Sequence, residues 1–327
     1  MNKFFFLFLV GASTFAHAQS YAPAAGQPGS TAIAYDNPIF VGWASHIEVH
    51  RGYINITDTS AVYNGSNRAT FGVPANAIGP ASNISTETVS LGDSGIAIVT
   101  FDTPIQNGTG PDFAVFENGV TDNFLELAHV EVSSDGINYV RFPSHSETQT
   151  DSQIGSFGTV DPTYLYNLAG KYRAGFGTPF DLEELKDSLN LDVNAITHVK
   201  IIDVVGSIGP KGTLDSYGNK INDLFPTPFN TGGFDLAGIG VIHQQSLDVH
   251  TEKLNFSVYP NPSQGQINIQ LYSPADELFV VNNLGQQIKY ISIKQTTSPI
   301  LFDLPQGIYF IHLKYGNQLI HQKVVVQ

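Results

Sequence analysis

The sequence predicts an all-β protein, in which a large β-sandwich or jelly-roll-like domain precedes a small β-sandwich. Short runs of β-branched and aromatic residues alternate with turn-forming segments, and only one short helix is expected. The 31 glycines and 18 prolines lie mostly in long connections, as is typical of sandwiches and jelly rolls. Cysteine is absent, which excludes disulfides and Cys-based zinc sites.

The elements of the large domain are predicted from alternation and from turn residues. A type I′ turn is expected at Asp135-Gly136, and a shift of phase near Ala128-His129 predicts a β-bulge. Asp181, with Glu184 as its capping-box partner, predicts one helix over 182–188. Strands are expected over 95–101, 112–116, 125–133, 137–142, 198–205 and 233–242.

The N-terminus has the pattern of a secretory signal peptide. Lys3 is followed by an apolar run over 4–10 and by the small-x-small site Ala16-His17-Ala18. The run is shorter than the about 20 residues that span a bilayer, and no transmembrane segment is expected elsewhere. The sequence thus predicts a signal peptide over 1–18, a flexible lead-in over 19–36, a β-sandwich cargo domain over 37–245, a linker over 246–253 and a final domain over 254–327.

In the final domain, the sequence predicts a compact sandwich of closely spaced β-rich runs. These runs lie over 258–272, 278–283, 287–293, 308–314 and 319–326. Its blocks 256–265, 280–286, 304–313 and 323–327 strongly resemble the type A sorting domain of the type IX secretion system of Bacteroidota. The resemblance implies that the type IX machinery is a partner, and that the cargo becomes attached to the outer-membrane surface or released. The positions that match the sorting signal are Pro260, Asn261, Pro262, Gly265, Gly285, Gly307 and Lys323.

Charge separates the two parts of the chain. Residues 19–251 hold nine basic and 25 acidic residues, whereas residues 252–327 hold five and four. A net charge of −16 on the cargo argues against nucleic acid and anionic membranes as partners, because both require a basic surface. The same acidity is compatible with Ca²⁺ binding.

Four aspartates are candidate Ca²⁺ ligands. Asp203 is expected to share a face with Val199 and Ile201, and Asp235 a face with Ala237, Ile239 and Val241. A carboxylate on an apolar face is costly unless it is paired or bound to metal. Asp215 and Asp223 flank a loop of oxygen-bearing residues around a glycine. The alternative is that these aspartates accept hydrogen bonds from backbone N–H groups in Asx turns and at strand ends.

Aromatic residues in the long loops are the candidate ligand-binding residues. The set is Tyr164, Tyr166, Tyr172 and Phe225, from loops within 143–180 and 206–233. Such rings stack on sugars and flat small molecules, but they also form satellite cores beneath loops. The single tryptophan, Trp43, is expected in a core.

The sequence identifies no catalytic residue. It contains no Gly-x-Ser-x-Gly elbow and no His-Glu-x-x-His motif, and its ten histidines are scattered. The catalytic carboxylate pair of a glycosidase remains an alternative, because the two residues of such a pair are distant in sequence and leave no local motif.

Several blocks of the cargo resemble a recurring bacterial cell-surface domain. Less closely, they are similar to surface proteins of Bacteroidota that capture cobalamin for an outer-membrane transporter, although those proteins are commonly lipoproteins and this chain has no Cys. The blocks are 113–119, 127–136, 168–172, 201–206 and 232–236.

The resulting expectation is a secreted, surface-displayed protein that binds a small molecule or glycan without transforming it. Capture of a corrinoid, a glycan-active hydrolase and an adhesive or structural protein are the alternatives.

Overall fold

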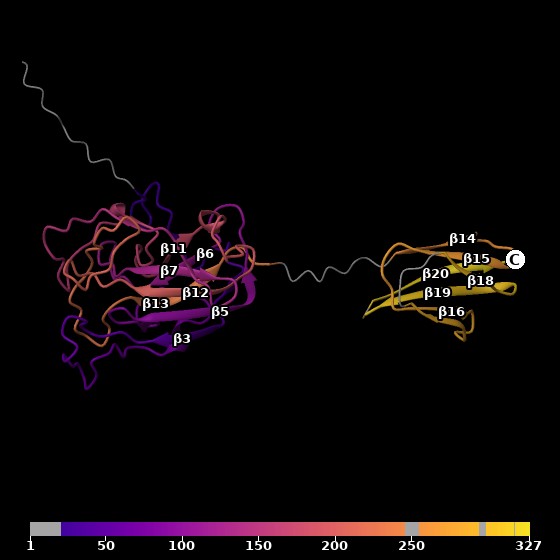
Figure 1. The fold of residues 1–327 in the computed structure, drawn as a ribbon, viewed down its shortest axis with the longest axis horizontal. Helices are drawn as coiled ribbons and strands as arrows, with labels where there is room; N and C mark the ends of the chain where they lie inside the picture. The colour runs from indigo at the N-terminus through magenta and orange to yellow at the C-terminus, as the bar shows by residue number, and fades with distance from the viewer. Residues whose placement is uncertain (1–20, 246–254, 294–298, 317) are drawn as a thin grey trace, which may run out of the picture. The chain divides into compact units, whose positions relative to one another are not determined.

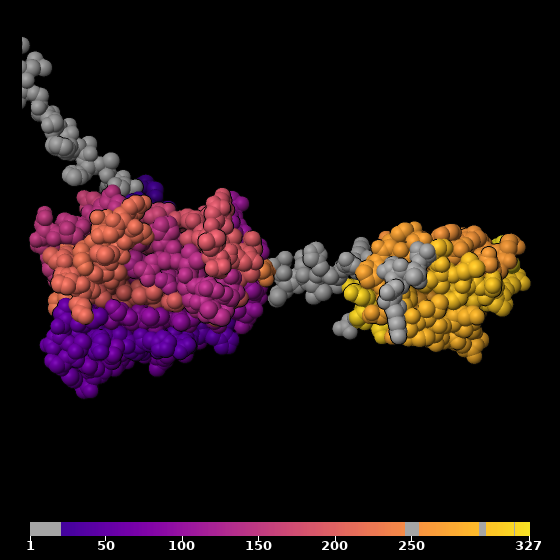
Figure 2. All heavy atoms as spheres, in the orientation of Figure 1, coloured from indigo at the N-terminus to yellow at the C-terminus, as the bar shows by residue number. Residues whose placement is uncertain are grey.

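The computed structural model describes residues 21–245, 255–293, 299–316 and 318–327. The chain divides into two compact units, Met1–Ser246 and Leu247–Gln327 (Figures 1 and 2). We refer to residues 21–245 as the cargo domain and to the described residues from 255 to 327 as the tail domain. Within these residues, none of the helices has the length and apolar character needed to cross a membrane. The expected signal peptide, with Ala16 and Ala18, and the expected linker lie outside the described residues.

Two antiparallel sheets form the cargo domain (Figure 1). The first has the order β1 (Ile33–Ala34), β11 (Phe176–Phe180), β6 (Phe113–Glu117), β13 (Asp235–Val241) and β2 (Gly42–Trp43), and β4 (Val89–Ser90) also pairs with β13. The second has the order β3 (His46–His50), β5 (Ile96–Ile105), β12 (Ile196–Asp203), β7 (Ala128–Ser133) and β8 (Val140–Arg141). A separate pair is β9 (His145–Ser146) with β10 (Leu165–Tyr166). Three short 3₁₀ helices complete the domain: η1 (Pro74–Ala77), η2 (Pro162–Tyr164) and η3 (Leu182–Leu185).

The main core lies between the two sheets. Val115 and Ile239 of the first sheet belong to the same buried cluster as Val130 and Val199 of the second. This arrangement confirms the predicted β-sandwich. The opposite face of the first sheet carries a smaller cluster, against which Trp43 packs with its ring centroid 5.5 Å from that of Phe116.

A third cluster lies under the loops at one end of the sandwich. It contains Leu125 and Leu127 from the segment before β7, Leu168 from the segment after β10, and Val204 and Ile221 from the segments after β12. This cluster supports the loops that carry the polar groups described below.

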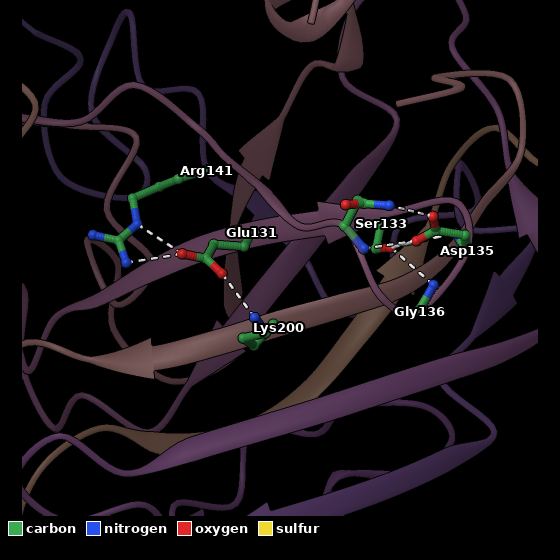
Figure 3. Close-up of polar contacts among 7 residues, drawn as sticks. Glu131, Ser133, Asp135, Gly136, Arg141 and Lys200 are labelled. Carbon is green, nitrogen blue, oxygen red and sulfur yellow. Dashed lines mark hydrogen bonds and ion pairs between the residues drawn. The ribbon is translucent and has the colours of Figure 1, made fainter. Parts of the chain in front are cut away.

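The hairpin between β7 and β8 forms, but not with the predicted turn. Glu131 pairs with Arg141, and residues 134–139 connect the strands. Type I′ geometry requires positive φ at both central residues, and in this loop only Gly136 has it, at 74°. Asp135 instead closes the loop by accepting hydrogen bonds from the backbone N–H groups of Ile137 and Asn138. Its side chain also accepts from the Ser133 hydroxyl (Figure 3).

Three further expectations need correction. β7 pairs with β12 without a shift of register, so the predicted bulge near Ala128 is absent, and the change of phase marks the start of the strand. The expected helix over 182–188 is the single 3₁₀ turn η3, although Asp181 does cap it through the N–H of Glu183. In β13 the register shifts between Leu236 and Gly238, so Ala237 does not share a face with Ile239 and Val241.

The segment predicted as a flexible lead-in lies on the cargo domain from residue 21 onward. Ile33 and Ala34 form β1, which pairs with β11. The ring of Tyr21 stacks on Tyr166 at a centroid distance of 5.1 Å. These contacts make the segment part of the wall of a pocket described below.

The tail domain is a second sandwich with its own core. A three-stranded sheet has the order β14 (Phe256–Tyr259), β15 (Gln266–Leu271) and β18 (Ile300–Asp303). A four-stranded sheet has the order β17 (Gln287–Ser292), β16 (Glu277–Asn282), β19 (Gly307–Tyr315) and β20 (Gln318–Val326). The predicted runs correspond to these strands, except that the run over 258–272 is divided between β14 and β15 and that β18 was not predicted.

Candidate functional site

Three carboxylates from distant parts of the cargo sequence meet at one end of the sandwich. Glu117 ends β6, Glu126 precedes β7, and Asp235 begins β13. One carboxylate oxygen from each residue lies within 4.8 Å of the others. Because β6 and β13 pair with Glu117 opposite Leu236, Glu117 and Asp235 are held close by the sheet itself. We call these three residues the carboxylate cluster.

The hydrogen bonds of the carboxylate cluster leave two oxygens without partners. Glu117 Oε2 accepts from the backbone N–H of Gly119 at 2.6 Å, and Asp235 Oδ2 accepts from Asn118 Nδ2 at 2.7 Å. Glu117 Oε1 and Asp235 Oδ1 are buried and have no hydrogen-bond partner. Buried polar atoms are nearly always satisfied, so two such oxygens in one cluster require an explanation.

Burial and mutual repulsion raise the pKa of each member. Burial first, and then the charge of Asp235, raise the pKa of Glu117 and of Glu126 well above the usual value of a glutamate. Burial raises the pKa of Asp235 to about 7, although the Ser90 hydroxyl, the Asn118 amide and, after these, the charge of Arg51 oppose the shift. The Arg51 guanidinium is already occupied, because it donates to the backbone carbonyls of Phe71, Gly72 and Ser90.

An open hollow of about 360 Å³ adjoins the carboxylate cluster, and Glu126 and Asp235 form part of its wall. Glu117 and Asp235 are buried, whereas Glu126 is partly exposed. Phe157, which is 79% exposed, lies at the hollow with its ring 5.8 Å from that of Phe229. The remaining wall residues include Phe71, Phe124, Asn118, Thr227 and Thr231.

The other three predicted Ca²⁺ ligands accept hydrogen bonds from backbone N–H groups. Asp203 accepts from Ser94 and Phe234, at 2.9 and 2.7 Å. Asp223 accepts from Leu127 and Leu224. Asp215 accepts from the N–H groups of Ser146, Tyr217 and Asn219. The structure therefore brings only Asp235 of the four into the carboxylate cluster.

A second and larger hollow, of about 560 Å³, contains one of the predicted aromatic residues. Tyr166 and Tyr21 stack in its wall, and the Tyr166 hydroxyl donates to Glu184 Oε2 at 3.0 Å. Apolar surface comes from Ile33 and Pro179. We call this hollow the tyrosine pocket.

Two buried polar groups line the tyrosine pocket. Burial lowers the pKa of Lys171 to about 8, and its ammonium donates to the carbonyl of Leu165 at 2.7 Å. The Thr178 hydroxyl is buried and has no hydrogen-bond partner. A mostly apolar pocket with a few converging polar groups is typical of small-molecule sites.

The other predicted aromatic residues lie outside the tyrosine pocket. Tyr172 is 1% exposed, and its hydroxyl is 2.8 Å from that of Thr31, which is in the pocket wall. Phe225 is 7% exposed, and Tyr164 is the last residue of η2. Of the four, Tyr166 alone has its side chain at either of the two hollows described here.

Sequence reasoning missed Glu117 and Glu126. Glu117 carries a visible signal, because it ends the run Phe113-Ala114-Val115-Phe116, all of whose residues are buried, as is Glu117 itself. A carboxylate that continues an entirely apolar strand predicts a buried charge. Glu126 has no comparable signal, since its position depends on how the loop before β7 returns to the other sheet.

The comparisons with known proteins bear on the tail domain. Residues 257–327 match the family model of the secretion system C-terminal sorting domain. This match supports the role of the chain as secreted cargo of the type IX system. No curated protein matches the chain.

Two solved structures show only a weak likeness. A β-glucuronidase from Parabacteroides merdae aligns at 11% identity with a TM-score of 0.22, covering 88% of this chain and 36% of that one. The BSP domain of a biofilm-associated protein aligns at 12% identity with a TM-score of 0.21, covering 71% and 48%. The chain thus spans less than half of either, and scores this low give no basis for transferring a function.

Sorting-signal positions from the two ends of the tail-domain sequence, Asn261 and Lys323, meet in its structure. Asn261 Nδ2 donates to the carbonyl of Lys323 at 2.8 Å, and Asn261 Oδ1 accepts from the N–H of Val325 at 3.0 Å. Gly285 has a φ of 78° in the turn after β16, and Gly307 begins β19. Asn261 therefore joins the first block of the sorting signal to the terminal strand β20.

Proposed function

We propose that the cargo domain is a non-catalytic ligand-binding protein that the tail domain delivers to the outer-membrane surface. The observation that carries this proposal is the tyrosine pocket, where stacked rings, a buried lysine and an unpaired threonine hydroxyl surround an open volume. Its volume of about 560 Å³ lies in the range of about 300–1,000 Å³ that is usual for small-molecule sites.

The chemistry of the wall favours a ligand with one flat face and several hydrogen-bonding groups. The Tyr21–Tyr166 pair offers a stacking surface, and Glu184 and Asn167 offer hydrogen-bond partners to hydroxyls. A mono- or disaccharide, or a planar metabolite, meets these requirements. A corrinoid is larger than the ligands typical of this volume, so it would contact the pocket through one edge only.

A glycan-active hydrolase is the second candidate, because Glu126 and Asp235 both line an open hollow. Retaining glycosidases hold two carboxyl groups about 5 Å apart across the scissile bond. Here a third carboxylate, Glu117, shares the same 4.8 Å neighbourhood, and Asp235 is 3% exposed. This crowding favours a bound cation over a pair that flanks a substrate.

A thermal-shift screen of the mature chain, residues 19–327, against glycans, planar metabolites and cobalamins tests the proposal. A ligand of the tyrosine pocket present at 100 times its dissociation constant should add about 2.7 kcal/mol of stability. Tyr166→Ala should abolish the shift, whereas Tyr63→Ala, which removes another exposed tyrosine, should preserve it. A ligand whose shift survives Tyr166→Ala would place binding elsewhere, and the absence of any shift from cobinamide and cobalamin would exclude the corrinoid version.

A further inference from the structure

We propose that Glu117, Glu126 and Asp235 bind one divalent cation of the oxygen-preferring class, best matched by Ca²⁺. This site is separate from the tyrosine pocket, and the proposal does not depend on the proposed function. It also differs from the four-aspartate site expected from the sequence, of which only Asp235 contributes.

The first argument is the pair of unpaired oxygens. Glu117 is 1% exposed and Asp235 is 3% exposed, and each leaves one buried oxygen without a hydrogen-bond donor. Two neighbouring donors are used on the other oxygens: Gly119 N–H on Glu117 Oε2 and Asn118 on Asp235 Oδ2. The Ser90 hydroxyl, which lies opposite Asp235 and opposes the rise of its pKa, is also buried without a partner. In each carboxylate, the hydrogen bond to one oxygen fixes the orientation of the other, unpaired oxygen. Metal-ligating carboxylates are oriented by hydrogen bonds in the same manner.

The second argument is the spacing of the oxygens. Ca²⁺ binds oxygen at about 2.3–2.6 Å, so two ligands on opposite sides of the ion are at most about 5 Å apart. The three oxygens lie within 4.8 Å of one another. One ion can therefore contact all three carboxylates without displacement of a strand.

The third argument is the charge balance. Among the described residues, no lysine, arginine or histidine forms an ion pair with any of the three carboxylates. Asp203 and Asp223 add further negative potential at Glu126, and Arg51, the opposing charge at Asp235, is committed to three carbonyls. A divalent cation would offset this repulsion, which Arg51 opposes only at Asp235 and without an ion pair.

The topology gives such an ion a structural role. Glu117 and Asp235 belong to β6 and β13 of the first sheet, and Glu126 immediately precedes the segment that enters β7 of the second. An ion bound by all three ties the two sheets together at their loop end. Because Glu126 and Asp235 also border the hollow of about 360 Å³, water or a ligand oxygen can complete the six to eight positions that Ca²⁺ takes.

Calorimetric titration of the chelator-treated mature chain with CaCl₂ alone tests this site. We expect one Ca²⁺ per chain, and a higher Tm with Ca²⁺ than with EDTA. Glu126→Gln is the principal variant, because no hydrogen bond in the described structure uses the Glu126 side chain. It should weaken Ca²⁺ binding at least about tenfold. Mutation of a residue that only hydrogen-bonds a metal ligand already costs about that much affinity, and loss of a ligand itself should cost no less. Glu147→Gln, which removes an exposed carboxylate elsewhere, should bind as the wild type does.

The stability of Glu126→Gln without Ca²⁺ separates a binding defect from misfolding. Removing one of three crowded carboxylates relieves repulsion, so its Tm in EDTA should equal or exceed that of the wild type. A Tm that rises in EDTA and no longer responds to Ca²⁺ would support the site. Absence of Ca²⁺ binding by the wild type, or equal binding by Glu126→Gln, would overturn it and would indicate a cluster neutralised by protons. Neither result bears on binding in the tyrosine pocket.

Discussion

Single buried carboxylates have two different tasks in the cargo domain. Asp203 uses both oxygens to accept hydrogen bonds from the backbone N–H groups of Ser94 and Phe234. These two residues lie outside the strands, so Asp203 holds their loops in place. Glu117 uses one oxygen to accept the backbone N–H of Gly119, Asp235 uses one to accept the side-chain amide of Asn118, and each leaves its other oxygen unpaired. This difference in hydrogen bonding, rather than burial, separates structural carboxylates from candidate ligands.

Replacement of Asp203 should be strongly destabilising. Asp203→Ala leaves the N–H groups of Ser94 and Phe234 without acceptors, and each unpaired buried group costs about 1–3 kcal/mol. We expect urea denaturation to show a loss of about 2–5 kcal/mol. Asp187→Asn, an exposed change in the segment after η3, is the control and should have little effect. A loss below 1 kcal/mol for Asp203→Ala would contradict the structural role.

Lys171 should give a pH-dependent contribution to stability. Burial lowers its folded-state pKa to about 8, whereas an unfolded lysine has a pKa of about 10.4. Between these values the unfolded chain binds more protons, so stability rises with pH. Relative to Lys171→Met, the wild type should gain about 1–2 kcal/mol between pH 8 and pH 9.5, measured by chemical denaturation of both proteins. A difference that stays constant or falls over this range would contradict a buried, charged Lys171.

At the scale of elements, the cross-strand charges of the second sheet organise the β7–β8 hairpin. Glu131 of β7 accepts from Arg141 of β8 and from Lys200 of β12 (Figure 3). Burial would raise the pKa of Glu131, but hydrogen bonds from Lys200 and Arg141 outweigh it and hold the pKa below the usual value. The stabilisation from Glu131 is therefore present above about pH 4 and is lost as pH falls through its folded-state pKa.

Double-mutant cycles should rank the two partners of Glu131. The Lys200 side chain is 18% exposed and Arg141 is 43% exposed, so solvent screens the arginine pair more. We expect a coupling of about 1 kcal/mol for Glu131–Lys200 and a smaller one for Glu131–Arg141, measured with alanine replacements. A larger coupling to Arg141 would show that its two contacts to Glu131 Oε1 outweigh burial.

In the tail domain, Asn261 should couple stability to export. Asn261→Ala removes both contacts to β20 and should lower the stability of the tail domain by about 1 kcal/mol, because the site is exposed and water can replace one bond. Asn268→Ala, which removes one longer contact of 3.3 Å, is the matched control. Surface display measured by antibody binding to whole cells should fall for Asn261→Ala and stay unchanged for Asn268→Ala. Equal surface display of the two variants would show that recognition by the secretion machinery does not depend on the contact between Asn261 and β20.

The elements could be predicted where their pattern is local. Local runs of β-branched and other apolar residues, bounded by turn residues, predicted β5, β6, β12 and β13. β1, β3, β11 and β18 were among the strands that were not predicted, since each is short and depends on a partner strand for its pairing. The carboxylate cluster depends on register between β6 and β13 and on the path of one loop, and neither is encoded in local pattern. Tyr166 was a candidate because long loops rich in aromatic residues are more often functional than disordered. Its stacking partner Tyr21 lies in a segment that was expected to be flexible.

At the scale of the whole molecule, the sorting domain and the proposed binding site belong to different units. The cargo domain and the tail domain have separate buried clusters, and the tail domain matches a sorting-domain model. A chain that ends at residue 246 should therefore keep the melting behaviour of the cargo domain and fail to reach the cell surface. Differential scanning calorimetry and protease treatment of whole cells measure the two properties. Unfolding of the truncated cargo, or its normal surface display, would contradict the division.

The proposed division of tasks also predicts the fate of a ligand. The most direct measurement is equilibrium dialysis of the mature chain against a ligand found in the screen, followed by mass spectrometry of the recovered ligand. The account predicts about one equivalent bound per wild-type chain, recovered chemically unchanged after prolonged incubation, and none bound by Tyr166→Ala. Recovery of cleaved ligand, or equal binding by Tyr166→Ala, would contradict non-catalytic capture in the tyrosine pocket.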